Sequence, residues 1–167
     1  MRVFVTGASG FIGSAVVGDL HAAGHRVLGL SRSDEGASAL AAAGAEPLRG
    51  TLEDLEALKA AAARSDAVIH LAFNHDFSRY LANCEEDRRV VETLGAALAG
   101  SGRPLIVTSG TGMSHTAPGK LAREEDAPAP SSLAPRAASE EAALAAASAG
   151  AAVSVVRLPQ VHDTRRQ

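Results

Sequence analysis

The chain has 167 residues, of which 46% are hydrophobic and 21% charged, a composition typical of one globular domain rather than a disordered segment. A formal net charge of -3 and an aromatic content of 3% argue against nucleic-acid binding. The alanine-rich segment 142–156 is shorter than the roughly 20 residues of a membrane helix. Met1 and Arg2 lead directly into a strand, leaving no room for a signal peptide, and Cys84 is the one cysteine. We therefore expect a cytoplasmic protein without a disulfide, a cysteine zinc site, a membrane partner or a nucleic-acid partner.

Short apolar runs alternate with helical patterns along the chain. We predict six strands, over residues 3–6, 26–30, 46–49, 67–73, 105–108 and 153–157, and five helices, over residues 14–23, 34–43, 55–63, 77–99 and 137–149. Four glycines each follow a predicted helix, as C-terminal caps do: Gly24, Gly44, Gly100 and Gly150. Asp54 stands at an N-cap position, and the proline-containing segment 110–135 is expected to be one long loop. Continuous apolar strands alternating with helices indicate an α/β fold with a doubly wound parallel sheet, its strands buried on both faces.

The first predicted strand runs into three glycines with the spacing G-x-x-G-x-x-G, and a helical pattern follows. The first glycine permits a sharp exit from the strand, the second lets the backbone approach a pyrophosphate, and the third allows close helix packing. Amides at the start of the helix would face phosphate oxygens. A glycine-rich turn without a ligand is the alternative interpretation. We predict a dinucleotide site that involves Gly7, Ser9, Gly10, Phe11, Ile12 and Gly13.

The end of the second predicted strand distinguishes the two nicotinamide cofactors. A site that prefers NAD usually carries an acidic residue there, which binds the ribose 2′-hydroxyl. This chain has Ser31 and Arg32 instead, and a guanidinium suits a 2′-phosphate. Asp34 comes slightly later and is expected to cap the next helix. We therefore predict NADP as the cofactor, with NAD possible and an exposed loop arginine as the alternative interpretation of Arg32.

Five segments, over residues 6–13, 49–54, 66–72, 107–109 and 156–161, resemble the NAD(P)-dependent epimerase/dehydratase branch of the short-chain dehydrogenase/reductase superfamily. The resemblance covers essentially the whole chain and implies one NAD(P)-binding Rossmann-type domain over residues 1–167. It also implies an oxidoreductase that acts on a small carbonyl or alcohol substrate. The residues that it assigns to the cofactor are Leu52 near the adenine, Leu71, Ala72 and Phe73 after strand four, Thr108 after strand five and Pro159 near the nicotinamide.

Two departures from the family pattern affect this expectation. Arg136 and Glu140 stand at the positions of the family's catalytic tyrosine and lysine, and the one tyrosine, Tyr80, lies in another helix. A guanidinium stays protonated and cannot act as the usual proton donor. The chain also ends shortly after its sixth strand, so the C-terminal substrate lobe of the family is expected to be absent. A non-catalytic NADP-sensing or protein-binding module is therefore the rival prediction.

The remaining polar candidates are less specific. Ser109 follows strand five, where its hydroxyl could orient a substrate carbonyl, so we predict it as the catalytic residue. An equally supported interpretation is that Ser109 is only a turn residue. His70 is expected to be a satisfied core histidine. His75 and Asp76 are expected at a helix start or in a surface loop. The charged run 84–89 is interpreted as the solvated face of a helix.

Overall fold

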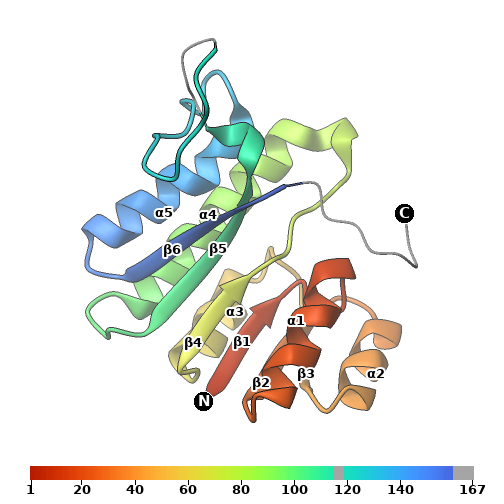
Figure 1. The fold of residues 1–167 in the computed structure, drawn as a ribbon. Coiled ribbons are helices and arrows are strands. Elements are labelled where there is room, and N and C mark those ends of the chain that lie inside the picture. The colour runs from red at the N-terminus through yellow and green to blue at the C-terminus, as the bar shows by residue number, and fades with distance from the viewer. Residues whose placement is uncertain (115–118, 160–167) are drawn as a thin grey trace.

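The computed structural model describes residues 1–114 and 119–159. Six parallel strands form one sheet in the order β3-β2-β1-β4-β5-β6 (Figure 1). The strands are β1 (Arg2–Thr6), β2 (Arg26–Ser31), β3 (Glu46–Arg49), β4 (Ala67–His70), β5 (Pro104–Gly110) and β6 (Ala152–Leu158). The helices are α1 (Phe11–Ala22), α2 (Asp34–Ala42), α3 (Leu55–Ala63), α4 (Tyr80–Leu98) and α5 (Ala138–Ser148). The predicted doubly wound, Rossmann-type α/β fold is thus confirmed.

Helices cover both faces of the sheet because its inner strands are apolar on both sides. Val17 of α1 and Leu40 of α2 pack with β1 and β2 on one face. On the other face the buried leucines and valines of α3 and α4 pack with β4 and β5, and α5 adds alanines. This two-layered core fixes the strand ends at which loops of widely separated sequence meet (Figure 1).

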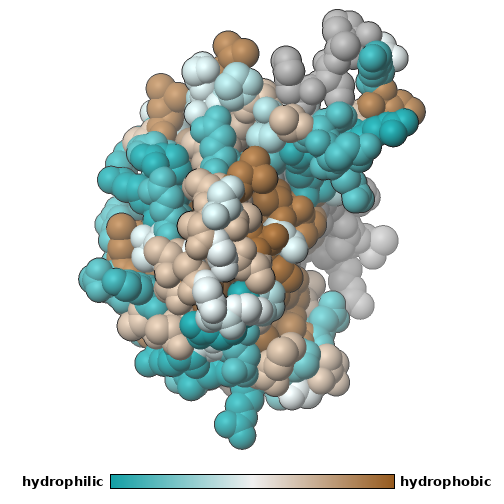
Figure 2. All heavy atoms as spheres, turned by 90° about the vertical axis from the view of Figure 1, so that its left-hand side faces the viewer, coloured by the Kyte–Doolittle hydropathy of each residue, from teal (hydrophilic) through white to brown (hydrophobic). Residues whose placement is uncertain are grey.

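The edge strand β6 departs from the prediction of strands buried on both faces. Val156 is 41% exposed and Leu144 of α5 is 55% exposed, and apolar side chains appear among hydrophilic ones on this side of the molecule (Figure 2). These side chains are exposed because β6 lies at the edge of the sheet, where it pairs with β5 alone among the described residues.

Helix ends follow the predicted chemistry with one exception. Gly24, Gly44, Gly100 and Gly150 all have positive φ, and the Asp54 side chain accepts a hydrogen bond from the Ala57 amide and caps α3. The prediction that Asp34 caps α2 was wrong. Ser33 is the N-cap, and its hydroxyl accepts from the Gly36 amide, while Asp34 pairs with Arg49 at 3.2 Å.

Three predicted boundaries were wrong by three residues, and the others by two at most. The fourth strand ends at His70 rather than at residue 73, because its neighbour β1 ends at Thr6 and offers no backbone partner beyond. The first helix begins at Phe11, directly after its N-cap Gly10. A 3₁₀ turn, Phe77–Arg79, precedes α4. Among its described residues, the predicted loop 110–135 contains a 3₁₀ turn, Thr111–Met113, and a bridge between Ser114 and Pro128, while positions 115–118 lie outside the described residues. None of the helices formed by the described residues is long and apolar enough to cross a bilayer.

Candidate functional site

A cleft of about 1360 Å³ crosses the carboxyl ends of the strands. It lies where the strand order reverses between β1 and β4, the position at which open α/β sheets bind ligands. Every residue predicted from the sequence as a site residue lines this one cleft: Gly7, Ser9, Gly10, Phe11, Ile12, Gly13, Ser31, Arg32, Leu52, Leu71, Ala72, Phe73, Thr108, Ser109 and Pro159. Their contact with a cofactor stays a prediction. The last two positions of the resembling segment 156–161 lie outside the described residues.

A side chain would have a different steric consequence at each of the three glycines of the first turn. Gly7 has a φ of 67°, and a Cβ there would lie 2.8 Å from the Ala72 nitrogen. A Cβ on Gly13 would lie 2.0 Å from the Gly7 carbonyl oxygen. Gly10 is different, because within the described residues its Cβ would meet only that oxygen, at 3.1 Å. Gly10 is also the N-cap of α1. Gly7 and Gly13 therefore allow the tight packing of the turn, whereas Gly10 leaves the N-terminus of α1 open to an anion.

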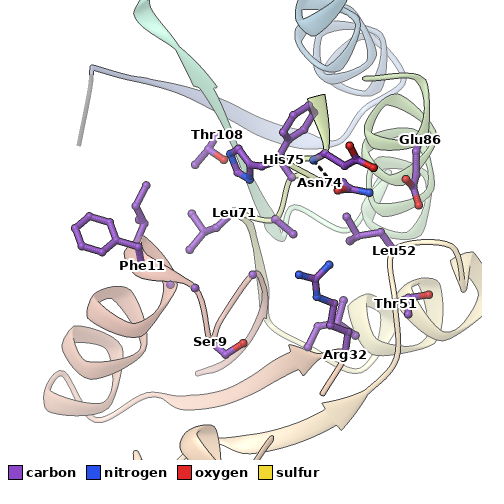
Figure 3. A pocket seen from close by; sticks show the side chains of 18 of the residues that line it. Ser9, Phe11, Arg32, Thr51, Leu52, Leu71, Asn74, His75, Glu86 and Thr108 are labelled. Atoms are coloured by element: carbon purple, nitrogen blue, oxygen red, sulfur yellow. Dashed lines mark hydrogen bonds between the residues drawn. The ribbon is translucent and has the colours of Figure 1, made fainter. Parts of the chain in front are cut away.

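Hydroxyl groups converge at the β2 end of the cleft. A Cβ on Gly36 would lie 2.4 Å from Ser31 Oγ, 3.1 Å from Ser9 Oγ and 3.2 Å from Ser33 Oγ. These groups therefore surround the first turn of α2, whose amides favour anions. Arg32 is exposed beside them, and its guanidinium points into the cleft toward Leu52 (Figure 3).

A buried chain of hydrogen bonds lies beneath the cleft. Thr6 Oγ1 accepts from the Ala72 amide at 3.3 Å and lies 2.7 Å from His70 Nδ1. His70 Nε2 lies 2.9 Å from Asp87 Oδ1. All donors are satisfied when the Thr6 hydroxyl donates to Nδ1 and the Nε2–H donates to Asp87. His70 is fully buried, so its prediction as a satisfied core histidine is confirmed.

Asp87 continues this chain to the far side of the cleft. Its Oδ2 accepts from Arg136 Nη1 at 2.9 Å and from Ser139 Oγ at 2.5 Å. Burial raises the pKa of Asp87, but His70, Arg136 and Ser139 outweigh burial and hold it below its ordinary value. Arg136 also donates to the Thr108 carbonyl oxygen at 3.1 Å. Arg136 thus stands at the cleft wall in a fixed orientation.

Glu140 makes a second buried ion pair. Its carboxylate accepts from Arg157 Nη2 at 2.7 Å and from the Ser109 hydroxyl at 2.5 Å. Arg157 Nη1 donates to Ser114 Oγ at 3.0 Å. The Ser109 hydroxyl therefore already donates to Glu140, and its predicted role toward a substrate stays a prediction. An anion at position 140 is accommodated because Arg157, from β6, faces it.

Aromatic rings gather after β4. Phe73 lies in edge contact with His75 and Tyr80, at centroid distances of 5.4 and 6.5 Å. Phe77 lies 6.1 Å from His75 and 6.0 Å from Tyr80. Burial raises the pKa of the Tyr80 phenol, and the Cys84 thiol raises it further. Tyr80 is therefore a weaker acid than an ordinary tyrosine.

Sequence reasoning missed part of the site. The interpretation of residues 84–89 as a solvated face holds for Glu85 and Arg89, which are exposed, and was wrong for Cys84 and Asp87, which are buried. The helical spacing contained the signal, since position 87 lies three residues before Val90 on the stripe that faces the sheet. The expectation for Asp76 was right, because it caps the turn at Phe77. His75 and Tyr80 line the cleft, which the sequence did not indicate.

Comparison with known proteins yields one family. The model of the NAD dependent epimerase/dehydratase family matches residues 3–161. An uncharacterized protein of Schizosaccharomyces pombe is 51% identical over 160 residues, which cover 95% of this chain and 53% of that protein. A ketoreductase of Stigmatella aurantiaca is 37% identical over 123 residues, 64% of this chain and 37% of that protein.

A solved structure agrees with these matches. The UDP-glucose 4-epimerase of Thermus thermophilus, in complex with NAD, is 25% identical with a TM-score of 0.74. The match covers 100% of this chain and 58% of that one. The chain thus spans about half the length of the Schizosaccharomyces pombe relative and of the Thermus thermophilus epimerase.

Proposed function

The chain belongs to the NAD dependent epimerase/dehydratase family, and from that premise we propose an oxidoreductase whose cleft binds NADP and a small carbonyl or alcohol substrate. Residues 1–167 form one nucleotide-binding domain in this proposal. The observation that supports it most strongly is the convergence of fifteen predicted residues, from six separate strand ends, on one cleft. The cofactor-bound epimerase structure adds support, because it has this fold at 25% identity.

The residues present fit a dinucleotide. Gly10 leaves the N-terminus of α1 uncovered, so the amides of Phe11 and Ile12 would hold the pyrophosphate. Leu52 would flank the adenine, while Thr108 and Pro159 would line the nicotinamide end. A reduced nicotinamide supplies a hydride to a carbonyl carbon when it is bound. The protein's part is to hold the carbonyl in place and to stabilise charge on its oxygen.

The preference for NADP over NAD rests on the β2 end. Arg32, the hydroxyls of Ser9 and Ser33, and the first turn of α2 together offer a cation and hydrogen-bonding groups for a 2′-phosphate. No acidic residue stands at position 31 or 32 to bind a free ribose 2′-hydroxyl.

Fluorescence titration of the full-length protein with NADPH and with NADH tests this preference. We expect NADPH to bind more tightly, and Arg32→Ala to weaken NADPH binding about ten-fold or more while NADH binding stays the same. Arg26→Ala is the matched control, because Arg26 is an exposed arginine at the opposite end of β2. Equal affinity for the two nucleotides, or unchanged NADPH binding in Arg32→Ala, would refute the 2′-phosphate site.

A non-catalytic NADP sensor is the second candidate, and Arg136 and Glu140 favour it by standing where the family pattern has its tyrosine and lysine. Turnover separates the two candidates. Oxidation of NADPH in the presence of a panel of aldehydes and ketones supports the oxidoreductase. Tight NADPH binding without oxidation across the panel supports the sensor.

A further inference from the structure

The few aromatic residues of this chain are concentrated at the cleft. The sequence has four phenylalanines, one tyrosine and no tryptophan. Phe4 is the one that lies in the core, whereas the other four line the cleft: Phe11, Phe73, Phe77 and Tyr80. Aromatic side chains ordinarily stabilise a protein by burial. Here Phe77 is 69% exposed, so its ring contributes little to the core and is available to a ligand.

The segment that carries these rings is held in place. Asn83, buried in α4, donates to the carbonyl oxygens of Asn74 and Asp76 at 3.2 and 2.7 Å. The Asp76 carboxylate accepts from the amide and the hydroxyl of Ser78. The backbone that carries the rings is therefore held in place before any ligand binds, which reduces the entropic cost of binding.

Arg136 lies directly against this aromatic cluster of Phe73, His75, Phe77 and Tyr80. Its guanidinium carbon is 4.5 Å from the centroid of the Phe73 ring, a stacking geometry that Arg favours. Nη1 uses both hydrogens, on Asp87 and Ser139, and Nη2 uses one, on Thr108. One Nη2 hydrogen and the Nε hydrogen have no partner among the described residues. Arg136 lines the cleft, and these two hydrogens are the ones that it has left to offer an acceptor there.

The charge of Arg136 favours a neutral acceptor. Asp87 neutralises the guanidinium at 2.9 Å, so a carboxylate would find no net positive charge. A carbonyl oxygen needs only hydrogen-bond donors, and it gains negative charge as a hydride reaches the neighbouring carbon. Arg136 suits such an oxygen and the oxyanion that forms from it.

On the premise of the proposed oxidoreductase activity, we propose that Arg136 binds the oxygen of a carbonyl conjugated to a planar aromatic ring, and that Phe73, Phe77 and Tyr80 bind the ring. The substrate class is thus aromatic aldehydes and ketones. A reduced nicotinamide in the cleft would supply a hydride to the carbonyl carbon, and the π electron pair would move to the oxygen beside Arg136. Arg136 keeps its own protons, so water in the open cleft would protonate that oxygen, and the products would be the alcohol and the oxidised nicotinamide.

Binding of two unreactive probes tests this without catalysis. Benzamide and cyclohexanecarboxamide share the carbonyl and the number of ring carbons, and only the first is aromatic. In NMR titrations of the full-length, cofactor-free protein we expect benzamide to bind about two- to ten-fold more tightly. Phe77→Leu should reduce that difference, and Leu81→Ala is the matched control because Leu81 is equally exposed, at 69%. Equal binding of the two amides, or an unchanged difference in Phe77→Leu, would overturn the aromatic site.

The role of Arg136 has a separate readout. Arg136→Lys keeps the charge and loses the planar donors, so both amides should bind about ten-fold more weakly. Unchanged amide binding in this variant would overturn the carbonyl contact. If Arg136→Lys fails to fold, the Phe77→Leu comparison still decides the aromatic site. Because the probes need no nucleotide, failure of this proposal is distinct from failure of NADPH to bind.

Discussion

The buried carboxylate of Asp87 allows a detailed prediction about the hydrogen-bond network beneath the cleft. It is 1% exposed and accepts hydrogen bonds from His70, Arg136 and Ser139. Asp87→Asn keeps the shape of the side chain, removes its charge and replaces one acceptor oxygen with a donor. The new amide then faces either the His70 Nε2–H or the Arg136 guanidinium, so one buried donor loses its partner.

The expected cost follows from the kind of contact that is lost. Breaking one side of a buried ion pair costs about 3–5 kcal/mol. At about 2–4 °C per kcal/mol for a domain of this size, Tm should fall by roughly 6–20 °C. Urea unfolding followed by circular dichroism measures the free energy of unfolding directly. Asp19→Asn is the control, since it makes the same chemical change on an exposed position of α1.

The pH dependence adds a second test of the same contact. The pKa of Asp87 in the folded state lies below its ordinary value. Its stabilisation is therefore complete above about pH 4, the value in the unfolded chain, and is lost as pH falls through the folded pKa. The stability difference between the wild type and Asp87→Asn should be largest at neutral pH and should shrink in acid. A cost below about 1 kcal/mol, or a difference that grows in acid, would show that these contacts do not stabilise the Asp87 carboxylate.

Two further predictions concern packing and charge. Gly13→Ala should destabilise the fold by several kcal/mol in urea unfolding, because its Cβ would lie 2.0 Å from a carbonyl oxygen. The Cβ of Gly18→Ala in the same helix meets no described residue within 4 Å, so this change should stabilise the fold by about 0.5–1 kcal/mol. Equal effects of the two changes would contradict the steric role of Gly13. Glu140→Lys should destabilise by facing Arg157, and Arg157→Glu added to it should restore stability, with a coupling energy of about 1 kcal/mol or more in a double-mutant cycle. Additive effects would show that positions 140 and 157 do not interact.

The fold could be predicted because each signal was local. Apolar runs, a glycine after each helix and the glycine turn each lie within a few residues, and the carboxyl ends of parallel strands meet at one edge of the sheet. Position in the chain was therefore enough to bring Arg32, Leu52, Phe73 and Pro159 to the same cleft.

The buried network could not be predicted because its partners lie far apart in the sequence. Asp87 is separated from His70 by 17 residues, from Arg136 by 49 and from Ser139 by 52. A charged residue in a helix usually faces solvent, so Asp87 was assigned to the wrong face. Similarly, the sequence pattern showed that an arginine stands at position 136 but could not show what neutralises it.

The central claim, a nucleotide bound over the glycine turn, is tested most directly at Gly10. Gly10→Ala places a methyl group where the pyrophosphate would approach, and within the described residues that methyl meets only the Gly7 carbonyl oxygen, at 3.1 Å. Fluorescence titration with NADPH should show binding to the wild type and at least about ten-fold weaker binding to Gly10→Ala. Urea unfolding should show that the variant stays folded. Equal NADPH affinity in the two proteins, or no NADPH binding to the wild type, would contradict the account.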